Sequence, residues 1–325
     1  MRDALSIEID GLCLHGTRHT GPNPSRRGIV FFNSGAQPRS GRGELYVQLA
    51  DKLAEHGFAC FRFDMPGLGD SDGELPARHV DLYQLIQDGG HAACAARLTQ
   101  VLLDMHKLDD MVLAGICGGA MTSVFAVPML PKRISGLVLL DLLFFSVRPR
   151  TAPGAQEQPR SSWRDKQTRR LAQWKASIHD KILTSRWEPQ ITALYHKLKR
   201  ASKAILPQRL PADANVKLLD VLTSVLNARI PALLISARPT QHTTPAFDYW
   251  AHLRQRCPRG WELVQIPGTT HSFVENGGSR AVLETILKWL SGHGSPHRGA
   301  LPAVLDTVGS KHTSFSPEYV SAGSE

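Results

Sequence analysis

The chain has 325 residues, of which 42% are hydrophobic and 21% are charged, with a formal net charge of +9. These shares are close to globular averages, so they exclude a fibrous or wholly disordered chain, and the length allows one α/β domain with an insertion. The N-terminus has no apolar stretch of signal-peptide length, and the most apolar segment, ISGLVLLDLLFF, is short and interrupted by Asp141. We therefore predict a cytoplasmic protein without a membrane span.

The first half of the chain alternates between strand and helix patterns. Residues 5–9 and 12–15 predict a hairpin, and residues 28–33, 59–63, 111–115 and 134–141 are short apolar runs typical of buried strands. Between them, we expect helices at 44–55, at 81–107 with fraying near Gly89 and Gly90, and at 118–128. This order predicts an α/β fold with a mostly parallel sheet and helices on both faces.

The strand pattern stops after Asp141 and resumes at 230–235 and 261–266, followed by a final helix at 279–290. We therefore predict a core made of residues 1–141 and 229–291, a helical lid inserted at 142–228, and a tail at 292–325 with too few apolar groups to form a packed structure. Residues 145–209 contain fifteen Lys or Arg against four acids. Such an excess could attract an acidic carrier protein or coenzyme A, although charge runs are more often solvated helical faces. Nucleic acid is a poorer candidate, because no binding motif accompanies the charge.

The sharpest motif is MVLAGICGGA, in which Gly115, Cys117 and Gly119 form a G-x-C-x-G between a strand and a helix. A nucleophile on such a tight turn needs small residues on both sides, and the start of the helix at Gly118 directs amide groups at the sulfur. We therefore predict that Cys117 is a catalytic nucleophile. The alternative is a buried structural cysteine in a glycine-rich turn. The five cysteines are scattered without a C-x-x-C pair, which argues against a disulfide framework, a zinc site or another metal centre, and nothing indicates a cofactor.

Other segments complete the expected site. The turn in GIVFFNSGAQ can offer an oxyanion amide from Gly35 or Ala36, beside that of Gly118. FRFDMPGLGDSDG contains a glycine-rich turn, for which we expect a structural role. PGTTHSFVE places His271 after the last strand, where the general base for Cys117 is expected in the order nucleophile, acid, histidine.

The acid is the open position of the site. The stretch after the strand at 230–235 reads LLISARPTQHT and contains no carboxylate. Asp141, which ends the preceding strand, is the first candidate to orient His271, Asp248 is the second and Glu275 the third. A Cys–His dyad without a strong acid could also function, because a thiol needs less help than a serine hydroxyl.

Over residues 12–290 these motifs resemble the α/β-hydrolase superfamily. They are most similar to hydrolases associated with exosortase systems and biosynthetic clusters, which carry N-x-G, R-F-D-x-x-G-x-G-D-S, G-x-C-x-G-A and H-[ST]-F segments, and the cysteine also resembles that of dienelactone hydrolases. The resemblance implies an α/β-hydrolase fold and an ester or thioester hydrolase that forms an acyl intermediate on Cys117. The alternatives are an acyltransferase or thioesterase acting on carrier-protein or CoA-bound acyl groups, and a non-catalytic binding protein that has kept the pocket and lost the chemistry.

Overall fold

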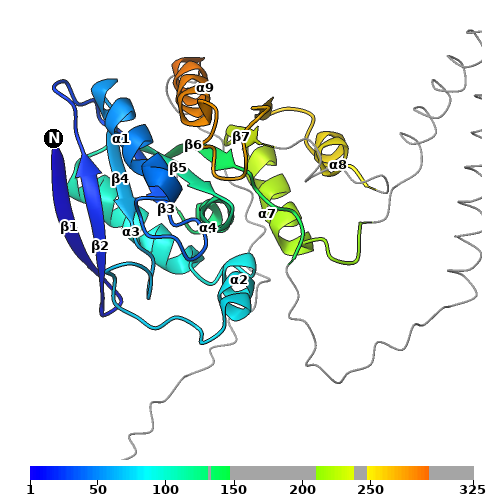
Figure 1. The fold of residues 1–325 in the computed structure, drawn as a ribbon, viewed down its shortest axis with the longest axis horizontal. Helices are drawn as coiled ribbons and strands as arrows, with labels where there is room; N and C mark the ends of the chain where they lie inside the picture. Colours follow the sequence, from blue (N-terminus) through cyan, green and yellow to red (C-terminus); the bar gives the residue numbers. More distant parts are fainter. Residues whose placement is uncertain (131–132, 147–209, 238–246, 293–325) are drawn as a thin grey trace, which may run out of the picture.

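The computed structural model describes residues 1–130, 133–146, 210–237 and 247–292, which form an eight-stranded sheet with helices on both faces (Figure 1). The strands are β1 (Arg2–Ile9), β2 (Leu12–His19), β3 (Arg27–Phe32), β4 (Ala59–Phe63), β5 (Asp110–Ile116), β6 (Ile134–Leu140), β7 (Ala232–Ser236) and β8 (Trp261–Gln265). The α-helices are α1 (Leu45–Glu55), α2 (His79–Gln87), α3 (Ala92–Met105), α4 (Gly118–Ala126), α7 (Val216–Asn227), α8 (Tyr249–Arg256) and α9 (Gly278–Gly292).

The sheet has the order β1-β2-β4-β3-β5-β6-β7-β8. The hairpin β1–β2 and the pair β2–β4 are antiparallel, and all other pairs are parallel. Every residue of β4, β5, β6 and β7 is buried, as expected of strands covered on both faces. The predicted hairpin and the predicted mostly parallel sheet are therefore confirmed.

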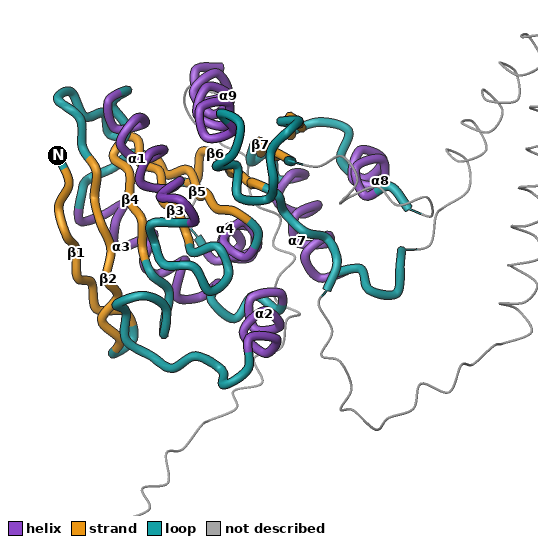
Figure 2. The backbone as a smooth tube through the Cα atoms, in the orientation of Figure 1, coloured by secondary structure: helices purple, strands orange, loops and turns teal. Residues whose placement is uncertain are grey.

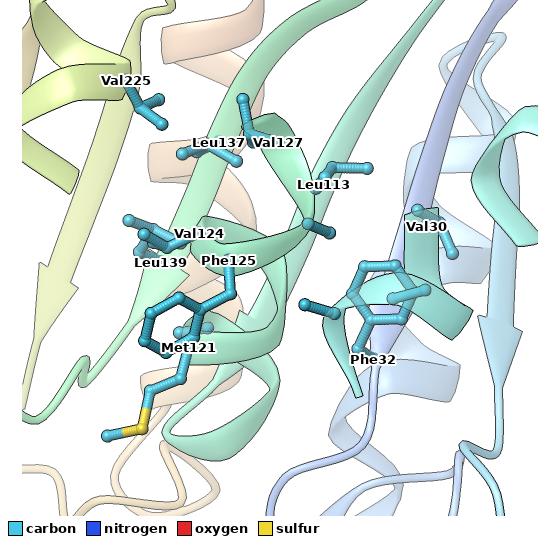
Figure 3. Close-up of a cluster of buried hydrophobic side chains, with 14 of the residues drawn as sticks. Val30, Phe32, Leu113, Met121, Val124, Phe125, Val127, Leu137, Leu139 and Val225 are labelled. Atoms are coloured by element: carbon cyan, nitrogen blue, oxygen red, sulfur yellow. The ribbon is translucent and has the colours of Figure 1, made fainter. Parts of the chain in front are cut away.

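Two helical layers enclose the sheet (Figure 2). Helices α1 and α9 pack against one face, and α3, α4 and α7 pack against the other. Figure 3 shows the second layer, in which Met121, Val124 and Phe125 of α4 lie over the side chains of β3, β5 and β6, with Val225 of α7 beside them. This packing fixes the start of α4 relative to the strand ends.

One helix that we predicted as continuous is interrupted in the structure. The helix expected over 81–107 is two helices, α2 and α3, separated by a turn in which Gly89 has φ of +81°. A positive φ is incompatible with a right-handed helix, and glycine adopts it without steric cost. The helix expected from residue 44 begins one residue later, because Glu44 itself has φ of 58°.

Most of the predicted insertion and of the tail, residues 147–209 and 293–325, lies outside the described residues. The last part of the insertion forms α7, whose buried leucines pack against the core beside α4. Among the described helices, none combines the length and the apolar composition needed to cross a membrane.

The topology brings four loops to one edge of the sheet. Parallel strands end at the same edge, so the residues that follow β3, β5, β6 and β8 meet there. These loops carry Gly35, Cys117, Asp141 and His271, respectively. The predicted site residues therefore come together from four separate parts of the sequence.

Candidate active site

Cys117 occupies a sharp turn between β5 and α4. Its backbone has φ of 52° and ψ of −108°, a conformation that is strained for a residue with a side chain. Its amide donates to the carbonyl of Leu140 at 2.9 Å, and its carbonyl accepts the amide of Met121 at 3.0 Å. Both backbone groups are thus held by the neighbouring strand and the following helix, while the side chain remains partly exposed.

The glycines on either side of the turn have no room for a side chain. A Cβ on Gly115 would lie 2.4 Å from the carbonyl carbon of Gly119, and a Cβ on Gly119 would lie 2.3 Å from the carbonyl oxygen of Phe32. Both distances are far below van der Waals contact. The G-x-C-x-G pattern therefore reflects the close approach of β5, α4 and the end of β3, as expected of a nucleophile elbow.

A buried tyrosine holds the base of this elbow. The hydroxyl oxygen of Tyr46, at the start of α1, accepts the backbone amide of Ile116 at 2.7 Å. The ring is fully buried and packs against Phe31, with centroids 5.1 Å apart. Burial raises the pKa of the Tyr46 hydroxyl well above its usual range, so the group stays neutral. Sequence analysis missed this contact, because no local pattern links Tyr46 to the residue before Cys117.

His271 and Asp141 are joined by a hydrogen bond. The Nδ1 atom of His271 lies 2.9 Å from Oδ2 of Asp141. Asp141 is completely buried, its Oδ1 atom accepts the amide of Ala237 at 2.9 Å, and its own amide donates to the carbonyl of Ile235 at 2.7 Å. The carboxylate is thus fixed in place and presents its second oxygen to the imidazole.

The electrostatic environment favours a protonated His271. Its pKa is raised to about 10, first by the hydrogen bond to Asp141 and then by a hydrogen bond to Cys117, against the opposing effect of burial. The imidazole therefore faces Asp141 through Nδ1, and Cys117 lies close enough to influence its pKa.

The other two candidate acids have different partners. Asp248 caps α8, with its Oδ1 atom accepting the amide of Ala251 at 3.0 Å. Glu275 accepts hydrogen bonds from the hydroxyls of Thr270, at 2.7 Å, and Ser272, at 3.1 Å, which lower its pKa. Glu275 thus braces the loop that carries the candidate histidine. Within the described residues, neither carboxylate is bonded to that imidazole.

The candidate oxyanion amides come from two elements in contact. Gly35 is buried, has φ of +60°, and its amide nitrogen lies 3.0 Å from the position that a Cβ on Gly118 would occupy. Gly118 is the first residue of α4, where helix amides have no partner within the helix. Within the described part of the chain, the amides of Gly35 and Ala36 make no hydrogen bond. The close approach to Gly118 involves Gly35, and Ala36 follows it in the same loop.

A buried polar network folds this loop. Asn33 donates from Nδ2 to the carbonyl of Gln37 at 2.9 Å and to Asp64 at 2.8 Å, and its Oδ1 atom accepts the amide of Met65 at 2.7 Å. Asp64 is fully buried and also accepts the amide of Arg39 at 2.6 Å and pairs with the guanidinium of Arg39. The Arg-Phe-Asp segment thus shapes the loop, in agreement with its expected structural role. The sequence signal that could have identified Asn33 is its position as a polar residue directly after a buried strand.

No metal centre is evident in the part of the chain that the structure describes, since no group of three His, Cys, Asp or Glu side chains could hold an ion there. The arrangement instead offers a thiol, an imidazole with a fixed carboxylate, and free amides at the start of a helix. These are the parts needed for nucleophilic acyl transfer.

Comparisons with known proteins agree with this architecture. A solved structure of DcsB in complex with its substrate analogue is similar, with a TM-score of 0.55 and 15% identity over 90% of this chain and 100% of that chain. The α/β hydrolase GrgF from Penicillium sp. sh18 has a TM-score of 0.52 and 18% identity, covering 90% and 99% of the two chains. The thioesterase domain from the curacin biosynthetic pathway has a TM-score of 0.50 and 14% identity, covering 88% and 99%. At these identities the likeness concerns the fold alone.

Among curated proteins, none matches the sequence. A sequence model described as the alpha/beta hydrolase fold matches residues 29–277, which is more than half of the chain. The protein therefore belongs to the α/β hydrolase fold family.

Proposed function

We propose that this protein hydrolyses an ester or thioester through an acyl intermediate on Cys117, with His271 as the proton-transfer group and Asp141 as its orienting acid. The observation that carries the proposal is the hydrogen bond between His271 and the buried Asp141, in a site where Cys117 lies close enough to raise the pKa of the same imidazole. A nucleophile, a base and a carboxylate that orients the base are the functional core of such enzymes. The strained turn at Cys117 supports the same conclusion, because strain of this kind is concentrated at functional sites.

Acylation uses the protonated imidazole of His271 and the thiolate form of Cys117. The pKa of His271 is raised to about 10, so the imidazole holds a proton at neutral pH. The thiolate of Cys117 is the attacking form, because the thiol itself is a poor nucleophile. The sulfur bonds to the carbonyl carbon, and the amides of Gly118 and Gly35 or Ala36 stabilise the oxygen as it becomes negative. The bond to the leaving alcohol or thiol then breaks, and that group departs with the proton from His271.

Deacylation uses the same histidine as a base. Once Cys117 is acylated its sulfur carries no charge, so the causes by which Cys117 raises the pKa of His271 are removed. The neutral imidazole takes a proton from water as the water oxygen bonds to the acyl carbon. Cleavage of the carbon–sulfur bond releases the carboxylic acid and restores the thiolate beside the protonated His271.

A second candidate function is acyl transfer, or thioester hydrolysis, with a carrier-protein or CoA-bound acyl group. The observation in its favour is the basic segment at 145–209, whose fifteen Lys or Arg residues exceed its acids by eleven. A carrier or coenzyme with negative charge would be attracted to such a segment, and the attraction would weaken with salt. In acyl transfer an alcohol or amine replaces water in the second step.

A covalent-labelling experiment tests the enzyme proposal. The purified protein is mixed with p-nitrophenyl esters and N-acetylcysteamine thioesters of several chain lengths, and acyl adducts are measured by intact-protein mass spectrometry. We expect one adduct that is absent in Cys117→Ala and forms slowly in His271→Ala. Its decay in water, alcohols or amines then distinguishes hydrolysis from transfer.

Cys13 provides a matched control for this experiment. Its sulfur also lies near a histidine, 3.8 Å from Nε2 of His15, but it is on β2 without a strained turn or adjacent helix amides. Cys13→Ala should keep the adduct. Absence of an adduct and of turnover with every donor would contradict the enzyme proposal and favour a non-catalytic binding protein.

A further inference from the structure

We propose that Tyr83 is a third hydrogen-bond donor to the substrate carbonyl oxygen, acting beside the amides of Gly35 and Gly118. The inference deepens the proposed function and rests on it, because it assigns a role only if an acyl group is bound at Cys117. Tyr83 lies on α2, a helix for which the sequence patterns predicted no part in the site.

Helix α2 covers both glycines of the candidate oxyanion site. A Cβ on Gly35 would lie 3.2 Å from a ring carbon of Tyr83 and 3.3 Å from its hydroxyl oxygen. One turn later on the same helix, Ile86 lies 3.2 Å from the Cβ position of Gly118. The tyrosine hydroxyl is therefore adjacent to the loop that carries the free Gly35 amide, while Ile86 packs on the start of α4.

The Tyr83 hydroxyl is available to a ligand. The side chain remains 37% exposed although its ring packs against Gly35. Its hydroxyl makes no hydrogen bond within the described residues, whereas the hydroxyl of the buried Tyr46 is engaged by the backbone amide of Ile116. An exposed hydroxyl beside the loop that carries the free Gly35 amide can donate to an oxygen that gains negative charge during the reaction.

The end of α2 is anchored, which keeps Tyr83 in position. The side chain of Asn215 donates to the carbonyl of Gln87 at 3.0 Å, and Nζ of Lys217 donates to the carbonyl of Asp88 at 2.6 Å. Donors that are already fixed in place stabilise a transition state most effectively, because they need no reorganisation when charge develops. A tyrosine on an anchored helix meets this requirement better than one on a loop.

The first test compares Tyr83→Phe with the wild type in pre-steady-state acylation by a p-nitrophenyl ester. Removal of one oxyanion donor typically lowers kcat about 100- to 1,000-fold, and partial exposure of Tyr83 places its expected effect at about 10- to 100-fold with little change in KM. The control is Leu85→Ala. Leu85 is on the same helix and similarly exposed, at 39%, but it packs over Gly90 instead of Gly35. This variant should acylate at the wild-type rate.

The second test uses an aldehyde with the same acyl chain as the ester. Addition of the Cys117 sulfur to the aldehyde forms a carbon–sulfur bond, breaks the π bond of the carbonyl and moves the thiol proton to the carbonyl oxygen. The carbon becomes tetrahedral and its oxygen lies at the oxyanion position, so the affinity for the aldehyde reports on the donors. Tyr83→Phe should lower the affinity for the aldehyde by the same factor as it slows acylation. Wild-type acylation and affinity in Tyr83→Phe would overturn the inference. The adduct at Cys117 would still form in that case. The proposed function is tested by that adduct, and the role of Tyr83 is tested by the change in rate and affinity.

Discussion

The Nδ1 atom of His271 lies 2.9 Å from the Oδ2 atom of Asp141, although the two residues are 130 positions apart in the sequence. The carboxylate follows β6, and the histidine follows β8, two strands further along the sheet. Asp141 adopts φ of 43°, which turns the chain sharply at the strand end. This contact supplies a fixed acid in a chain that has no carboxylate in the segment directly after β7, residues 237–247.

Replacement of Asp141 by asparagine should move the pH dependence of acylation. In the wild type the protonated His271 persists until its pKa of about 10, so the acylation rate should fall as pH rises through that value. Asp141→Asn removes the largest cause of the raised pKa, and an amide oxygen can still accept the amide of Ala237. We therefore expect a slower reaction whose alkaline decline begins at lower pH. First-turnover rates between about pH 6 and 11 measure this, and an unchanged alkaline decline would contradict the assignment.

The ion pair between His271 and Asp141 should make the free energy of unfolding depend on pH. A histidine whose pKa is raised by folding contributes stability that is fully present below its unfolded pKa and is lost as pH rises through its folded pKa. For His271 this window runs from 6.5 to about 10. The difference in unfolding free energy between the wild type and His271→Gln, measured by urea denaturation, should therefore shrink across this range. The variant Gln48→Ala, on the exposed side of α1, should show no such trend. A difference that grows with pH would be inconsistent with a protonated histidine in the folded protein.

The strands, the elbow and the histidine loop were predictable because each has a local cause. Continuous apolar runs are needed in strands covered on both faces, and the glycines at 115 and 119 reflect contacts that exclude a Cβ. The break between α2 and α3 was harder to place. Two adjacent glycines weaken a helix, but the sequence does not show whether the helix frays there or the chain turns. In the structure Gly89 has a positive φ, and the chain turns.

The acid and the supporting residues could not be derived in the same way. Asp141, Asp248 and Glu275 all stand at loop or helix boundaries, and only the parallel register of β6, β7 and β8 brings one of them to the imidazole. The contacts of Asn33 and Tyr46 join segments 31 and 70 residues apart. Such contacts are set by tertiary packing, so no local pattern predicts them.

The strain at Cys117 should be measurable as stability. A non-glycine residue with its φ of 52° and ψ of −108° costs about 1–3 kcal/mol. Glycine removes that cost but loses up to about 1 kcal/mol through the greater freedom of the unfolded chain. We therefore expect Cys117→Gly to unfold with a free energy about 1 kcal/mol higher than that of Cys117→Ala, while neither forms an acyl adduct. Comparison of the two variants removes the effect of losing the thiol. A glycine variant less stable than the alanine variant would show that the turn is not strained.

Removal of the Tyr46 hydroxyl should weaken both the fold and the elbow. In Tyr46→Phe the buried amide of Ile116 loses the acceptor that lies 2.7 Å away, and the hydroxyl position becomes an apolar void. An unsatisfied buried donor costs about 1–3 kcal/mol, so the unfolding free energy should fall by about that amount. Tyr249→Phe is the control, because Tyr249 is also buried but its hydroxyl makes no hydrogen bond to the described residues. Acylation of Cys117 should slow in Tyr46→Phe alone, since Ile116 directly precedes the nucleophile and its freedom displaces the sulfur from His271. Equal stability loss in the two variants, with wild-type acylation in both, would mean that the Tyr46 hydroxyl does not support the elbow.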